Sequence, residues 1–259
     1  MQLLKLRYRA LLLGVLFAPL AQAQPVIKFG VDPSYPPFEQ KQPDGSLSGF
    51  DIDLGNALCA ELQVKCIWVE QNFDGMVPAL KARKFDAILS AFSATAARFL
   101  NDTATTEIYT APSSLVARKD SGLLPTAASL KGKSVGVVQG TLHEAFARAQ
   151  WGNQGVNIHT YQTQDQVFSD LINGRLDATF QASVQADAGL LQKPQGQDFA
   201  FAGEPITDKS IIGDGVAIGI RKNEPELKQQ LNTALASIRE SGEYQQIAKK
   251  YFNFDIYGE

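Results

Sequence analysis

The chain has 259 residues, of which 44% are hydrophobic and 20% are charged, values that are ordinary for a folded globular protein and exclude a disordered one. Three of the 24 basic residues and none of the 27 acidic ones lie in the first 23 positions, so the rest of the chain carries a net charge of −6. Such an acidic chain is a poor partner for nucleic acid.

Residues 1–23 are typical of a secretory signal peptide. Basic residues precede an apolar run from Ala10 to Leu20, and Ala21-Gln22-Ala23 supplies the small residues of a cleavage site. The run is too short for a membrane anchor, and no other stretch is long and apolar enough. No cysteine follows the cleavage site to carry a lipid. We therefore expect cleavage near Ala23 and a soluble protein in the periplasm that begins near Gln24.

The next stretch predicts a strand that leads into a binding site. Val26 to Val31 is rich in β-formers and is stopped by Asp32-Pro33, which places Asp32 and Tyr35 at the carboxyl end of the strand. Small ligands bind at this end of the strands in open α/β sheets. A turn at Pro43-Asp44-Gly45 then precedes a helix that begins near Phe50-Asp51.

Cys59 and Cys66 are the only cysteines of the chain. In an oxidising compartment, two thiols this close in sequence pair more readily than they bind metal. The two histidines, His143 and His159, lie far away in sequence and show no metal-ligand spacing. The pattern favours a disulfide and predicts neither a metal nor a cofactor.

The remainder of the chain alternates between helices and strands. Arg83 to Ser90 ends a helix and begins a buried strand, and a related phrase recurs from Gly174 to Gln181. Another apolar strand is expected from Ser134 to Val138. This repeated pattern favours two α/β lobes of similar construction. The chain then ends with two helices that are separated at Ser241-Gly242.

Three segments resemble the periplasmic binding proteins for polar amino acids, particularly those for lysine, arginine, ornithine and histidine. They are Gly30 to Phe38, Gly49 to Leu54 and Lys250 to Gly258. The resemblance implies a two-lobed type II fold with the ligand in the inter-lobe cleft. It also implies a monomer that delivers its ligand to the permease of an ABC importer. We place lobe 1 at residues 24–111 plus 211–259 and lobe 2 at residues 112–210.

The resemblance also implies how the carboxylate of an amino acid would be bound. Ser90, Ser93, Thr95 and Arg98 match the family pattern S-x-T-x-x-R, whose arginine clamps the ligand α-carboxylate in a bidentate manner. A solvated surface arginine is the alternative for Arg98.

The opposite lobe supplies a helix start after a strand. Thr141 and Glu144 have the spacing of a capping box, and the free N–H groups at such a terminus attract an anion. The family often has threonine where Leu142 stands, so one side-chain hydrogen bond is missing here. His143 either reaches the ligand or faces solvent.

In the proteins resembled, aromatic residues at Tyr35 and Phe73 sandwich the methylenes of the ligand, and a carboxylate at Asp32 receives its cationic tip. This arrangement suits arginine, because a planar guanidinium stacks on aromatic rings and pairs with carboxylates. Asp51 either joins this pocket or caps the helix that it precedes.

Ala182 departs from the family pattern. Relatives that bind plain amino acids have an aspartate there, which pairs with the α-ammonium group. Opine-binding relatives have small residues at this position and resemble the chain at His143 to Phe146. The leading hypothesis is therefore a receptor for a cationic amino acid, with an octopine- or nopaline-like opine as the alternative ligand. An enzyme similar to the periplasmic dehydratases is a minor alternative.

Residues 101–110 have no apolar period. Their ten letters equal the translation of one frame of a widely used sequencing adapter, and we hypothesise an assembly artefact; a diverged polar loop is the alternative. Resequencing the gene from its source distinguishes the two.

Overall fold

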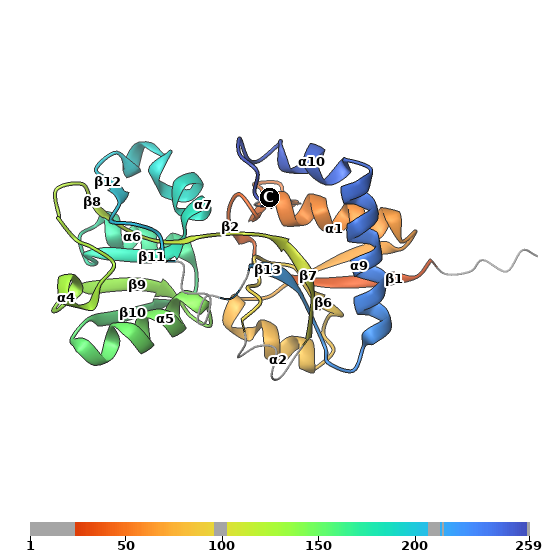
Figure 1. The fold of residues 1–259 in the computed structure, drawn as a ribbon, viewed down its shortest axis with the longest axis horizontal. Coiled ribbons are helices and arrows are strands. Elements are labelled where there is room, and N and C mark those ends of the chain that lie inside the picture. Colours follow the sequence, from red (N-terminus) through yellow and green to blue (C-terminus); the bar gives the residue numbers. More distant parts are fainter. Residues whose placement is uncertain (1–23, 96–102, 207–212, 214, 258–259) are drawn as a thin grey trace, which may run out of the picture.

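The computed structural model describes residues 24–95, 103–206, 213 and 215–257, and its strands form two large sheets that lie side by side (Figure 1). The predicted signal peptide lies outside the described residues. The first sheet has the strand order β5-β1-β6-β13-β7. Its strands are β1 (Val26–Val31), β5 (Lys65–Glu70), β6 (Ala87–Ile88), β7 (Thr103–Tyr109) and β13 (Val216–Ile220).

The second sheet has the strand order β10-β9-β11-β8-β12, and a small sheet with the order β2-β3-β4 follows β1. The strands of the second sheet are β8 (Ser113–Arg118), β9 (Ser134–Val138), β10 (Asn157–Tyr161), β11 (Ala178–Ala182) and β12 (Phe199–Phe201). The small sheet contains β2 (Ser34–Tyr35), β3 (Glu39–Lys41) and β4 (Leu47–Ser48). This mixed arrangement confirms the predicted α/β class.

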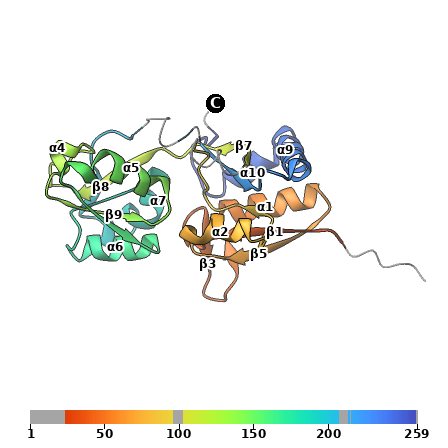
Figure 2. The same ribbon diagram turned by 90° about the horizontal axis from the view of Figure 1, so that it is seen from below.

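Helices cover both faces of each large sheet. Those of the first sheet are α1 (Phe50–Glu61), α9 (Pro225–Glu240) and α10 (Glu243–Ala248) on one face and α2 (Met76–Lys81) on the other. Those of the second are α4 (Ala127–Leu130) and α5 (Leu142–Gln150) on one face and α6 (Gln164–Ile172) and α7 (Ser183–Ala186) on the other. Figure 2 shows α6 and α2 from below. No helix among these described residues is both long and apolar enough to span a bilayer.

The chain passes from the first sheet to the second and back again. The first passage joins β7 to β8 through residues 110–112, and the return runs from β12 to β13. Loops that follow β1, β6 and β9 border a cavity between the sheets. The predicted strand at Val26–Val31 has those bounds in the structure, and Cys59 and Cys66 form the predicted disulfide.

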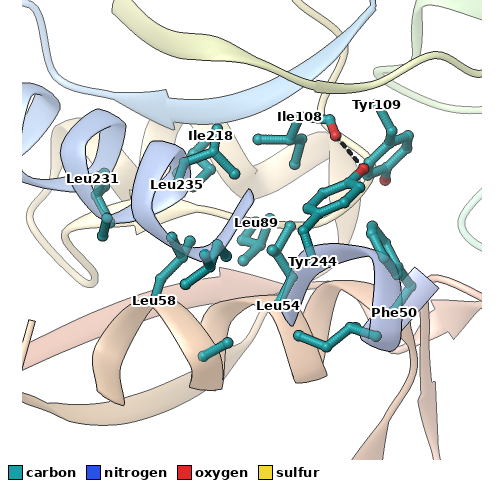
Figure 3. Packing of buried hydrophobic residues seen from close by; sticks show 14 of the residues in the cluster. Phe50, Leu54, Leu58, Leu89, Ile108, Tyr109, Ile218, Leu231, Leu235 and Tyr244 are labelled. Carbon is teal, nitrogen blue, oxygen red and sulfur yellow. Dashed lines mark hydrogen bonds between the residues drawn. The ribbon is translucent and has the colours of Figure 1, made fainter. Parts of the chain in front are cut away.

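The alternative of a polar loop at residues 101–110 is wrong for the described part of that segment. Thr103–Tyr109 is a strand because its backbone pairs with β13, which supplies the partner that the local sequence does not reveal. Ile108 and Tyr109 are fully buried, and the Tyr244 hydroxyl donates to the Ile108 carbonyl, as Figure 3 shows. The adapter hypothesis itself stays a prediction.

Candidate ligand-binding site

A cavity of about 40 Å³ lies between the two sheets and brings together most of the predicted site residues. The first sheet and its loops contribute Asp32, Ser34, Tyr35, Glu39, Phe73, Ser90, Ala91 and Ser93. The second contributes Val138, Thr141, Leu142, His143 and Gln164.

Asp32 provides a buried carboxylate at the carboxyl end of β1. It accepts hydrogen bonds from the Ser34 hydroxyl (2.6 Å) and from the Phe73 backbone N–H (2.9 Å). Burial raises the pKa of Asp32, while these two donors counteract part of that effect. The Asp32 backbone N–H donates to the hydroxyl of Ser90 at 2.9 Å, which ties the ends of β1 and β6 together.

Two aromatic rings stand on the same side of the cavity. Tyr35 comes from β2, and Phe73 begins the short turn before α2, where its ring lies 6.3 Å from that of Phe92. The Tyr35 hydroxyl also accepts a hydrogen bond across the cleft from the backbone N–H of Ala182, at 3.3 Å. This bond joins the two sides directly.

The start of α5 faces these groups from the second sheet. The Thr141 hydroxyl caps the helix by accepting from the Glu144 N–H at 3.2 Å. The second bond of the expected capping box is not formed, because the Glu144 carboxylate accepts instead from the N–H of Gly140, at 2.8 Å. The Glu144 charge still lies beside the positive end of the helix dipole, which it stabilises.

His143 and Leu142 are both buried at the cavity wall. A solvent-facing orientation of His143 is therefore wrong. Its Nε2 lies 3.1 Å from the hydroxyl of Ser113, and the ring packs edge-on against Phe180. These contacts fix the imidazole at the surface of the cavity.

The serine and threonine pattern is only partly assembled at this cavity. Ser90 and Ser93 line it, whereas Thr95 is buried nearby and is absent from the lining residues. Arg98, the predicted carboxylate clamp, lies outside the described residues.

Asp51 neither lines the cavity nor caps α1, so both expectations for it are wrong. Gly49 occupies the N-cap, and Asp51 is a fully buried residue of the first turn of α1. Its Oδ2 accepts from the Ala91 N–H at 2.7 Å and from the Tyr109 hydroxyl at 3.3 Å. Ala91 has a φ of 44°, in the left-handed region that non-glycine residues rarely adopt.

Ala182 ends β11 and is buried, but it does not belong to the cavity lining. A second, wider crevice of about 950 Å³ begins beside it and is lined by residues that include Pro112, Ser183 and Tyr251. The Tyr35–Ala182 hydrogen bond thus connects Tyr35, which lines the cavity, with Ala182, which directly precedes a residue that lines the crevice.

Five lining residues were not predicted from the sequence: Ser34, Glu39, Ala91, Val138 and Gln164. Gln164 is the first residue of α6, and the residues Thr163 and Gln166 on either side of it form a capping box. The Thr-x-x-Gln spacing could have revealed this second helix start. Nothing in its local sequence marks Glu39, which reaches the cavity only because β3 folds back beside Ser90.

The two sides also meet at an outer rim. The Asn72 side chain donates to Gln162 at 3.2 Å, and Gln162 donates to Gln139 at 3.0 Å. Gly140 packs directly against the backbone of Asp74. We call Asn72, Asp74, Gln139, Gly140 and Gln162 the rim contact.

The chain is similar to several known proteins. Residues 27–254 match the bacterial extracellular solute-binding proteins, family 3. The chain is 47% identical over 233 residues to the lysine/arginine/ornithine-binding periplasmic protein of Escherichia coli, covering 90% of each. It is 43% identical over 249 residues to the L-arginine-binding protein of Pseudomonas aeruginosa, covering 96% of each.

Solved structures of similar fold include a Salmonella typhimurium periplasmic binding protein with high arginine specificity. It has a TM-score of 0.81 and 32% identity, and the match covers 88% of this chain and 100% of that one. An ancestral amino-acid-binding protein that is a precursor of cyclohexadienyl dehydratase has a TM-score of 0.77 and 27% identity, with 88% and 96% covered.

Proposed function

Because the chain belongs to the bacterial extracellular solute-binding proteins, family 3, we propose that it is the periplasmic receptor of an ABC importer for a cationic amino acid. One observation carries this proposal. The buried Asp32 carboxylate and two aromatic rings share a cavity with the capped amino terminus of α5. These groups complement the cationic tip, the methylenes and the carboxylate of one ligand.

In this proposal, Asp32 pairs with the ammonium or guanidinium group, and Tyr35 and Phe73 pack against the aliphatic part. Arg98 and the N–H groups at the start of α5 bind the α-carboxylate from opposite sides. A bound ligand would therefore hold the cleft closed.

We further propose that residues 24–111 plus 211–259 and residues 112–210 move as two lobes of a monomer. The closed receptor would then present both lobes to a membrane permease. The relatives named above are binding proteins, and we propose that this chain likewise binds its ligand without converting it. Incubation with candidate ligands followed by mass spectrometry should show no product.

Calorimetric titration of ligand-stripped protein tests the proposal. L-arginine, L-ornithine, L-lysine and L-histidine should bind, and at least one of them should bind in the micromolar range or tighter. L-citrulline, which has nearly the shape of arginine without its charge, is the matched control and should bind more weakly. Equal affinity for arginine and citrulline would remove Asp32 as the partner of a cation.

A second candidate ligand is an opine, an amino acid whose nitrogen bears a second carboxylate-containing group. Ala182 favours it, because this small residue, whose backbone N–H donates to the Tyr35 hydroxyl, stands where relatives that bind plain amino acids have an aspartate. Octopine and nopaline belong in the same titration series. Tight opine binding with weak arginine binding would select this candidate.

A further inference from the structure

Two buried carboxyl groups lie close together, one in the lining of the cavity and one behind it. Glu39, on β3, is 1% exposed and lines the cavity, while Asp51, in the first turn of α1, is 0% exposed. The Glu39 Oε1 atom accepts from the Ser90 hydroxyl at 2.9 Å. The Asp51 Oδ2 atom accepts from Ala91 and Tyr109. In each carboxyl group, therefore, one oxygen accepts hydrogen bonds from these donors and the other oxygen has no such donor.

A proton on one of the two groups would satisfy both of the remaining oxygens. Within the described part of the chain, Glu39 Oε2 and Asp51 Oδ1 have no partner while both groups are ionised, because two carboxylates cannot donate to each other. One proton on Glu39 lets it donate to Asp51. Burial, and then the charge of Asp51, raise the pKa of Glu39 well above its usual range, and burial raises the pKa of Asp51 to about 6.

The neighbours of the pair reinforce this protonation. Asp32, at the end of β1, adds a negative charge that also raises the pKa of Glu39. Tyr109 from β7 and Tyr244 from α10 contribute neutral phenols, since burial raises the pKa of both above the usual range. Across the cavity, His143 is the titratable group among the described lining residues that follow the strands of the second sheet. Asp32, Glu39 and Asp51 therefore form an acidic cluster in which protonation of Glu39 is favoured.

Ser90 connects this pair to the predicted cation site. Its hydroxyl donates to Glu39 and accepts from the backbone N–H of Asp32, so the two acidic side chains stand on one wall. A ligand cation beside Asp32 would also lie in the field of Glu39. In a desolvated cavity, a nearby positive charge favours the ionised form of a carboxyl group.

We propose that Glu39 is a specificity-determining residue that holds a proton in the empty site and releases it to solvent when a cationic ligand binds. This inference rests on the proposed function. The Glu39 carboxyl loses the proton, Asp51 stays ionised, and the ligand cation replaces the proton as the counter-charge. A neutral ligand cannot supply that charge, so the pair stays protonated and selects for cations.

The sign of the pH dependence follows from this exchange. Because the ligand-bound form holds fewer protons than the empty form, affinity for arginine should rise with pH while the pair is protonated in the empty site. The rise approaches about tenfold per pH unit in the limit of one released proton.

The test is calorimetry with L-arginine at about pH 7, in phosphate and in Tris, two buffers whose ionisation enthalpies differ widely. Wild type should give binding heats that differ between the buffers in the direction of proton release. Glu39→Gln should abolish that difference, because the amide can still accept from Ser90 and donate to Asp51 but exchanges no proton. His143→Gln tests the titratable group on the opposite wall of the cavity and should keep the difference.

The possible results distinguish a failure of the proposed function from a failure of the proton exchange alone. Arginine that fails to bind wild type at millimolar concentration would overturn the proposed function. Arginine that binds with the same heat in both buffers would overturn only the proton exchange. Loss of the buffer difference in His143→Gln, with its retention in Glu39→Gln, would assign the proton to His143. Glu240→Gln, which removes an exposed carboxylate from α9 outside the cavity, should behave as wild type.

Discussion

Gly140→Ala should weaken ligand binding by preventing full closure at the rim contact. A Cβ atom at Gly140 would lie 2.8 Å from the Asp74 Cα atom, whereas ordinary contact begins at 3.4 Å, so the two backbones must separate by about 0.6 Å. Two hydrogen bonds that cross the cleft, Asn72–Gln162 at 3.2 Å and Tyr35–Ala182 at 3.3 Å, have little length to spare.

The cost can be estimated from those bonds. Each contributes about 0.5–1.5 kcal/mol, so losing both removes about 1–3 kcal/mol from the closed state, or roughly a 5- to 150-fold increase in Kd. The loss should appear mainly as faster dissociation, since the open form that first meets the ligand does not make the rim contact.

Gly132→Ala is the matched control. Gly132 precedes β9 as Gly140 follows it, and the two have φ angles of 75° and 77°. Nothing lies within 4 Å of a Cβ atom at Gly132. Both substitutions should therefore cost about 1–2 kcal/mol of unfolding free energy from backbone strain, measurable by urea unfolding without ligand. Only Gly140→Ala should lose affinity. If both variants bind arginine equally well, the rim contact plays no part in the closed, ligand-bound form.

Three further predictions concern the site and the disulfide. Arg98→Ala should abolish binding at a cost of about 2–5 kcal/mol with the fold retained; unchanged calorimetric affinity would place Arg98 on the surface. Ala182→Asp should strengthen arginine binding by about 1.5–3 kcal/mol, roughly ten- to a hundred-fold, and weaken opine binding. An unchanged order of affinities would show that residue 182 does not face the ligand nitrogen. Thiol labelling of denatured, unreduced protein should modify neither Cys59 nor Cys66, and labelling of both would contradict the disulfide.

Local patterns were sufficient for much of the fold. The alternation of β-formers before Asp32-Pro33 gave the bounds of β1, and the threonine at position 141 gave the start of α5. Asp32 and Tyr35 reach the cavity because a strand end is a fixed place in an α/β sheet. Features of this kind depend on neighbours in sequence, which a single chain displays.

The remaining features depend on partners that are distant in sequence. Asp51 bonds to Ala91 and Tyr109, 40 and 58 positions away, so its burial could not be read from the helix that it begins. Glu39 likewise depends on Ser90. The polar segment Thr103–Tyr109 becomes a strand through β13, more than a hundred residues later. In each case tertiary pairing overrides local preference.

The place of β13 has a consequence for the order in which the protein folds. This strand lies between β6 and β7, so the first sheet stays split until residues 216–220 have been synthesised. The second sheet uses only strands between Ser113 and Phe201 and is complete earlier. During vectorial emergence of the chain, the middle of the sequence can reach its native pairing first. The amino-terminal strands must wait, with their apolar faces exposed, which makes them the part of the nascent chain most in need of chaperone protection.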